Sequence, residues 1–169
     1  MELSAPIQRY KLGNADGIAD GYRVQWSDVT LYDFFLEIGL TSKKSLTIGA
    51  LYIPDEYFFE FLRGSFDGDG CFYSYFDPRW KSSFMFYMMF SSGSEAHINW
   101  LQETINRLIG LKGHVTHGKK GNGIHNLKYA KKESLILLYH LYKNKEVPHL
   151  SRKKLKINDA LRIVGESIK

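Results

Sequence analysis

Hydrophobic residues follow two different periods along the 169-residue chain, and together they predict strands and helices. Short runs that are rich in aromatic or β-branched residues and bounded by turn residues predict strands. We expect six strands, at residues 7–12, 22–26, 71–76, 84–90, 114–116 and 125–129. Apolar residues at helical spacing predict helices between Asp28 and Gly39, over 56–67, between Ser94 and Gly110, and over 134–142 and 151–167.

Residues that favour turns and helix ends separate these elements. N-caps are expected at Ser27 or Asp28, at Asp55 and at Ser94, because their side-chain oxygens can accept hydrogen bonds from the first backbone N–H groups of a helix. We expect turns at residues 13–21, 77–79 and 118–123.

An internal similarity divides the chain into two parts. Residues 22–44 and residues 125–154 each give the order of a strand, an apolar helix and a basic cluster, whereas the intervening segment 55–110 has no earlier counterpart. We therefore predict a partial repeat at 1–54, made of a hairpin, a helix and a connector. A complete repeat at 55–169 would end in a basic helix. Chance similarity between amphipathic segments is the alternative.

Composition excludes several classes of protein. The one cysteine, Cys71, excludes an internal disulfide framework and a metal site made only of cysteines. With 44% hydrophobic residues the chain is typical of a folded protein, and it has no run of 18 uncharged apolar residues that would span a membrane. The first ten residues lack the pattern of a secretory signal, so we expect an intracellular protein.

Charge is distributed unevenly around the net value of +5. Residues 1–111 hold 9 Lys/Arg and 14 Asp/Glu, whereas residues 112–169 hold 14 and 4. A basic segment beside aromatic-rich strands favours a polyanionic partner, of which nucleic acid is the commonest. The alternative is a lysine-rich face that contacts only solvent.

The segment 62–70, with the sequence LRGSFDGDG, carries the most specific pattern. Gly64 and Gly68 share one helix face, where each costs about 1 kcal/mol of helix propensity. That cost is acceptable where another helix backbone approaches closely. Asp67 and Asp69 stand at the helix C-terminus, where the dipole is negative, so a hard divalent cation such as Mg²⁺ would suit them. A plain Asp-Gly turn is the alternative.

This segment resembles the nine-residue motif of the LAGLIDADG homing endonucleases. The matching residues are Leu62, Gly64, Asp67, Asp69 and Gly70, with Gly68 in place of alanine. The order of elements over 55–145 and the segments 38–45 and 150–153 are also similar to that family. The resemblance implies an α+β fold with a curved antiparallel sheet, shaped like a saddle and covered by helices. It also implies site-specific hydrolysis of double-stranded DNA with Mg²⁺.

The resemblance implies roles for individual residues as well. Two motif helices would pack through an interface formed here by Leu62, Gly64 and Gly68. Asp69, with the Gly68 carbonyl, would bind the metal ion, and Asp67 would order the helix end. A basic residue near each site would act on phosphate or solvent, and these are Lys44 and Lys153, preferred over the neighbouring Lys43 and Lys154. Residues 91–94 offer only serines and a glycine for a solvent-orienting group.

Strand alternation sorts the side chains expected to contact DNA. Arg, Gln and Asn read base edges, whereas Lys mostly contacts phosphate. We expect one face of each hairpin to carry these groups: Arg9, Lys11, Arg23 and Gln25; Tyr73, Tyr75, Arg79 and Lys81; Asn126 and Lys128. In the alternative arrangement Tyr73 and Tyr75 belong to the core, and Phe72 and Phe76 point outward.

The chain holds one motif, whereas an active site of this family needs two. It would therefore form a homodimer, pair with a second chain that carries the other motif, or bind nucleic acid without cutting it. The expected function is a Mg²⁺-dependent DNA endonuclease. A catalytically inactive DNA-binding protein, or an intron RNA-binding protein similar to a maturase, is the second hypothesis. A protein unrelated to nucleic acid, with the glycine-rich helix as a dimer interface, is the third.

Overall fold

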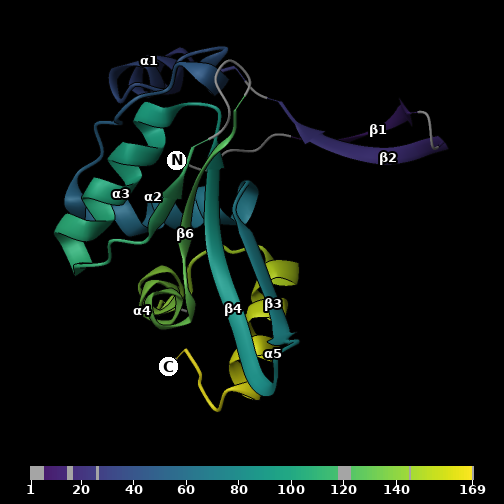
Figure 1. Ribbon diagram of the computed structural model, residues 1–169. Helices are drawn as coiled ribbons and strands as arrows, with labels where there is room; N and C mark the ends of the chain where they lie inside the picture. The colour runs from purple at the N-terminus through teal and green to yellow at the C-terminus, as the bar shows by residue number, and fades with distance from the viewer. Residues whose placement is uncertain (1–5, 15–16, 26, 118–122, 145, 169) are drawn as a thin grey trace. The chain divides into compact units, whose positions relative to one another are not determined.

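Five α-helices and two antiparallel sheets make up the described part of the chain, an α+β fold (Figure 1). The computed structural model describes residues 6–14, 17–25, 27–117, 123–144 and 146–168. The chain divides into two compact units, Met1–Leu36 and Glu37–Lys169. Each unit is considered by itself below. The repeat boundary that the sequence indicates at residue 54 stays a prediction.

The smaller unit contains a hairpin and a helix. Strands β1 (Ile7–Asn14) and β2 (Gly17–Val24) pair antiparallel, so the second strand begins five residues earlier than the sequence predicts. Trp26 of that predicted strand lies outside the described residues. Helix α1 (Val29–Glu37) follows, and its predicted cap is confirmed, because the Leu31 N–H donates to Asp28 Oδ1 at 2.9 Å. Every residue of α1 is at least partly exposed.

The larger unit follows the order of two 3₁₀ turns, η1 (Lys44–Leu46) and η2 (Asp55–Tyr57), and then helices and strands. These are α2 (Phe58–Gly68), β3 (Cys71–Asp77), β4 (Trp80–Ser92), α3 (Glu95–Ile109), β5 (His114–Thr116), β6 (His125–Tyr129), α4 (Lys131–Tyr142) and α5 (Ser151–Ile163). The four strands form one antiparallel sheet in the order β3-β4-β6-β5. The hairpin of β5 and β6 has the bounds that the sequence predicts, and its connection at 118–122 lies outside the described residues.

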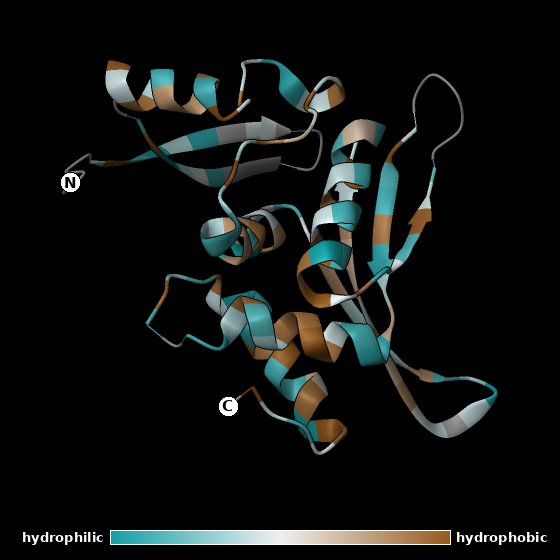
Figure 2. Cartoon of the chain, turned by 90° about the vertical axis from the view of Figure 1, so that its left-hand side faces the viewer, coloured by the Kyte–Doolittle hydropathy of each residue, from teal (hydrophilic) through white to brown (hydrophobic). Residues whose placement is uncertain are grey.

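The hydrophobic core lies between one face of this sheet and helices α2 to α5. Along β4 the even-numbered residues from Phe84 to Phe90 are buried and the odd-numbered ones are half-exposed, as a period of two requires. Helices α3 and α4 pack on β4 and β6, and α5 packs on β3. Strand β4 therefore buries one face and leaves the other half-exposed. Along β6 a single hydrophobic band lies between hydrophilic residues (Figure 2).

Two predicted caps use their side chains differently from expectation. Asp55 receives two hydrogen bonds from the Arg107 guanidinium, at 2.5 and 2.6 Å, which holds the pKa of Asp55 below its ordinary value. Ser94 directly precedes α3, but its hydroxyl donates to the Ile48 carbonyl at 2.5 Å. Both side chains thus fasten distant segments together instead of satisfying a helix N-terminus.

The start of α4 was predicted three residues too late. Ser134 was expected at the first turn, whereas α4 begins at Lys131. Ser134 is fully buried, donates to the Tyr129 carbonyl at 2.8 Å and accepts the Met88 N–H at 3.2 Å. Its hydroxyl therefore joins the helix to the sheet. In the described part of the chain, no helix is long and apolar enough to cross a membrane.

Candidate active site at the end of helix α2

Helix α2 has one buried face and one open face. Leu62 and Phe66 are fully buried in the core of the larger unit. Gly64 and Gly68 are exposed, and a Cβ atom added at either would meet no atom within 4 Å. The predicted interface of Leu62, Gly64 and Gly68 therefore needs a correction. Leu62 belongs to the core, because a fully buried side chain cannot reach a partner helix. Of the three predicted interface residues, only the two glycines lie on the open face.

The carboxylate of Asp67 fastens the end of α2 to the last part of the chain. Its Oδ1 accepts the Tyr142 hydroxyl at 2.5 Å and its Oδ2 accepts the Leu150 N–H at 2.9 Å. Burial and this carboxylate raise the pKa of the Tyr142 hydroxyl. Leu150 directly precedes α5, so one side chain joins three elements. The expectation that Asp67 orders the helix end is confirmed.

Lys153 binds three backbone carbonyls at the C-terminus of α2 and just beyond it. Its ammonium donates to the Phe66 carbonyl, to the Asp67 carbonyl at 3.1 Å and to the Gly70 carbonyl at 2.5 Å. The side chain is buried, and this desolvation lowers the pKa of Lys153. Its predicted direct part in catalysis does not fit this geometry, because all three N–H donors are used inside the protein. Lys153 is a positioning residue for the end of α2.

Asp69 lies on the opposite, open side of the same helix end. It is exposed and lines a pocket of about 360 Å³, whose other walls include the exposed Lys44 of η1 and residues at the end of β4. The structure thus brings together Asp69 and Lys44, two predicted site residues that are 25 positions apart. Ser91 and Ser92 line the same pocket, so hydroxyl groups are present where the sequence left the solvent-orienting role unassigned.

The segment that carries Lys44 is fixed from the side of α3. The Ser94 hydroxyl donates a hydrogen bond to the Ile48 carbonyl, and Nδ1 of His97 lies 2.9 Å from the Gly49 carbonyl oxygen. Burial lowers the pKa of His97. Gly93 permits the close approach, because a Cβ atom there would lie 2.8 Å from both the Ser45 carbonyl oxygen and the Leu46 side chain. The segment that carries Lys44 is therefore held in place by three residues, Gly93, Ser94 and His97.

The donor set beside Asp69 fits a hard divalent cation. The Asp69 carboxylate is exposed, and among the hydrogen bonds of the described residues none reaches the Gly68 carbonyl. Mg²⁺ prefers oxygen donors and commonly uses one or two carboxylates together with water and substrate phosphate. One chain supplies one such carboxylate. A two-carboxylate site would need a second chain.

The sheet face opposite the helices carries a cluster of tyrosines. Tyr73 and Tyr87 stack with their ring centroids 5.1 Å apart, and Tyr75 continues the stack at 6.2 Å from Tyr87. The Lys128 ammonium lies 3.9 Å from the centroid of the Tyr87 ring. Phe72 is buried on the other face and Tyr75 is exposed, so the alternative with Tyr73 and Tyr75 in the core is wrong, although Phe76 is exposed as that alternative expects. Asn126 also lies on the tyrosine face, where its Oδ1 accepts the Ser91 hydroxyl at 2.7 Å.

The other predicted DNA-contacting residues are placed differently from expectation. Arg79 lies in the turn between β3 and β4 and is held by the carboxylate of Asp77, so it does not belong to the strand face. The side chain of Lys81 lies outside the described part. In the smaller unit Gln8 pairs with Arg23, and Arg9 pairs with Tyr22. Arg23 is therefore on the face opposite Arg9 and Lys11, and Gln25 follows the end of β2.

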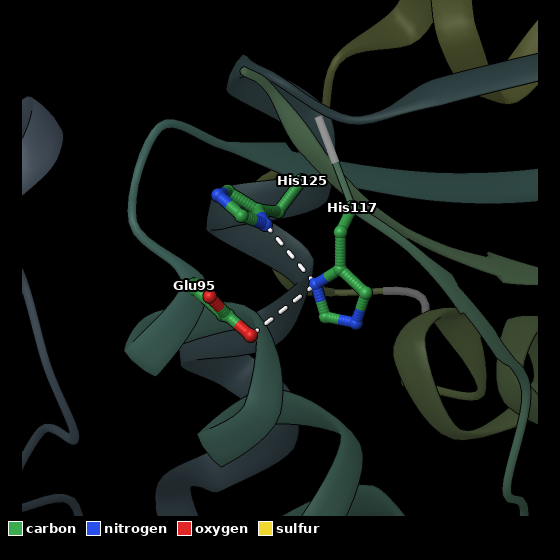
Figure 3. Close-up of side chains that lie close together, drawn as sticks. All are labelled: Glu95, His117 and His125. Atoms are coloured by element: carbon green, nitrogen blue, oxygen red, sulfur yellow. Dashed lines mark hydrogen bonds and ion pairs between the residues drawn. The ribbon is translucent and has the colours of Figure 1, made fainter. Parts of the chain in front are cut away.

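One candidate group of metal-ligating side chains is not predicted from the sequence. Glu95, His117 and His125 bring three potential metal-ligand atoms within 4.8 Å of one another (Figure 3). The available signal was the position of the two histidines, one at each end of the connection between β5 and β6. Neither models of known protein families nor curated protein sequences gave a match to this chain.

Proposed function

We propose that the chain is a site-specific, Mg²⁺-dependent DNA endonuclease of the LAGLIDADG homing type, active when two α2 helices pair. The placement of Asp69 carries the proposal. Its exposed carboxylate stands at the end of α2, lines one pocket with Lys44 and adjoins the open face of Gly64 and Gly68. A helix end with this combination suits metal-assisted hydrolysis of a phosphodiester at a helix pair.

The order of elements supports the finer fold. A motif helix, two strands, a helix, two strands and a helix follow one another from α2 to α4, as in the repeat of that family. The four strands form one antiparallel sheet with helices on one face, which leaves the other face for a flat or grooved polymer. We therefore interpret the larger unit as one LAGLIDADG repeat.

The residues of the pocket would divide the work of hydrolysis. A bound Mg²⁺ supplies Lewis acidity to the scissile phosphate and to water. Asp69 holds the ion, and the Lys44 ammonium offsets charge that develops on the phosphate. The Ser92 hydroxyl would orient solvent, since the Ser91 hydroxyl donates to Asn126. Each chain provides one such pocket, so cleavage of both strands requires two copies of Asp69, most simply in a homodimer.

Cleavage of a randomised duplex library tests the proposal without knowledge of the target. The full chain and Mg²⁺ are incubated with the library, and the cleaved ends are sequenced. We expect a common sequence among the ends and a mass in light scattering near twice 19.5 kDa. Asp69→Asn should bind the selected site without cutting it. Asp33→Asn, which removes an exposed carboxylate from α1, is the matched control and should cut normally.

Two outcomes would contradict the endonuclease. In the first, no common sequence appears among the ends. In the second, the wild-type chain and Asp69→Asn cut equally well, which would show that Asp69 has no catalytic part.

The tyrosine cluster favours a second candidate function. Stacked aromatic side chains beside a lysine are typical of surfaces that bind unpaired bases. The chain would then bind intron RNA without cutting nucleic acid. Tighter binding to a single-stranded RNA library than to the duplex library, unchanged by Mg²⁺, would favour this function over the endonuclease.

A further inference from the structure

A second cluster of metal-ligating side chains lies apart from the pocket of Asp69. Glu95 is the first residue of α3, His117 follows the last residue of β5, and His125 is the first residue of β6. His117 Nδ1 lies 3.3 Å from His125 Nδ1 and 3.4 Å from Glu95 Oε1. Figure 3 shows the three side chains converging on one point.

The strand register explains why the two histidines meet. The last pair of the β5–β6 ladder is Thr116 opposite Asn126, so His117 and His125 face each other one step further along. Because side chains alternate between faces, His125 points to the same side as the buried Leu127, toward the helices. Helix α3 begins there, and Glu95 completes the group. The arrangement follows from backbone pairing and not from chance side-chain positions.

Two of the three separations match those between ligands of a tetrahedral zinc ion, and the third, between Glu95 and His125, is within 4.8 Å. Imidazole nitrogens and carboxylate oxygens bind Zn²⁺ at about 2.0–2.1 Å, and tetrahedral angles then place ligand atoms about 3.3–3.4 Å apart. The two separations at His117 Nδ1 fall in this range. Two imidazoles with one carboxylate are a donor set that suits Zn²⁺ and other borderline transition ions, and Mg²⁺ does not prefer imidazole.

We propose that Glu95, His117 and His125 bind one Zn²⁺ ion per chain. The ion joins the end of the β5–β6 hairpin to the start of α3, with a fourth position left for water. All three ligands are at least partly exposed, so the ion can enter from solvent. The site therefore ties the end of β5 to the start of β6 as well as to α3.

Calorimetric titration of the metal-free full chain with Zn²⁺ tests the site. We expect one ion per chain, and a Co²⁺ titration should give the visible absorption of a tetrahedral complex. His117→Ala should weaken Zn²⁺ binding by roughly 100-fold or more, because loss of a direct ligand exceeds the effect of removing an outer partner. Glu95→Gln should weaken binding with little change of shape. Zn²⁺ should raise the melting temperature of the wild type but not of His117→Ala.

Two controls separate this site from other histidines and from the pocket. His114→Ala removes an exposed histidine from the same strand and should bind Zn²⁺ like the wild type. Asp69→Asn should also retain the ion, so failure of the nuclease and failure of the zinc site are separate results. Absence of a stoichiometric ion in the wild type, or unchanged affinity in both His117→Ala and Glu95→Gln, would overturn the proposal.

Discussion

The two sides of the end of helix α2 carry similar residues in opposite environments. On the buried side, Asp67 and Lys153 use their polar atoms within the protein and fasten α2 to α5. On the open side, Asp69 and Lys44 are exposed and line a pocket. A carboxylate and an ammonium therefore serve to hold the helix end on one side. On the other side, the same two groups are left free for a ligand.

The largest expected contrast is between the two carboxylates. Asp69→Asn should lower the rate of DNA cleavage by roughly 1,000-fold or more, because it removes a ligand of the catalytic ion. Its free energy of unfolding should change by less than about 0.5 kcal/mol, since the side chain is exposed. Single-turnover cleavage and urea unfolding measure the two quantities.

Asp67→Asn should show the reverse. It leaves buried partners imperfectly satisfied and should lower the free energy of unfolding by about 1–3 kcal/mol. The folded fraction should still cut DNA. If Asp67→Asn abolished cleavage at unchanged stability, the division between the two sides would be wrong.

The two lysines give the next contrast. Lys153→Met removes the donor of three backbone carbonyls and should cost about 1–3 kcal/mol of stability in urea unfolding. Lys44→Met should leave stability unchanged and lower the cleavage rate by roughly 100-fold, as expected for loss of a charge beside the transition state. Equal destabilisation by both variants would show that Lys44 has a structural part as well.

Glycines at the same helix end sharpen the comparison further. Gly70→Ala places a Cβ atom 2.4 Å from the Phe66 ring and 2.7 Å from its carbonyl oxygen, so it should destabilise the chain by about 1–3 kcal/mol. Gly64→Ala meets open space and should stabilise the single chain by about 0.5–1 kcal/mol. In light scattering it should weaken the dimer, whereas an unchanged dimer would exclude this face from the interface.

The smallest expected effect is the pH dependence of the free energy of unfolding that His97, beside the pocket, contributes. Burial lowers the pKa of His97 in the folded chain, so the unfolded chain binds the proton more tightly. The stability that His97 contributes is complete above its unfolded pKa of about 6.5 and is lost as pH falls through the folded value. Urea unfolding between pH of about 7.5 and 5.5 should show this loss. His97→Gln should have a flatter profile, and an identical slope would refute the assignment.

The local pattern of hydrophobic and turn-forming residues predicted the elements whose bounds depend only on neighbouring residues. The hairpin of β5 and β6 and the ends of α2 at Gly68 and α3 at Ile109 follow from strand alternation and from helix-ending glycines. The separation of Phe72 from Tyr73 also follows once one face is buried. The pairing of Asp69 with Lys44 was predicted from a resemblance alone, because nothing local relates positions so far apart.

The remaining errors share one cause, since each depends on which distant segment lies opposite. Arg23 lies on the face opposite Arg9, not on the predicted shared face, because the pairing of β1 with β2 sets the register of the smaller hairpin. Lys153 was assigned to catalysis because its sequence neighbours do not show that α5 begins beside the carbonyls of α2. Glu95 meets His117 and His125 only after the whole sheet has formed. Such relations are fixed by tertiary packing and leave little local signal.

The absence of a side chain at Gly93 sets how closely the segment of Ser45 and Leu46 approaches the end of β4. Any side chain at this position must displace the carbonyl of Ser45 or the side chain of Leu46, the two residues that follow Lys44. The displacement would change the separation of the Lys44 ammonium from the Asp69 carboxylate while both residues remain in place. Reactivity could thus be adjusted in small steps from a position that carries no chemistry of its own.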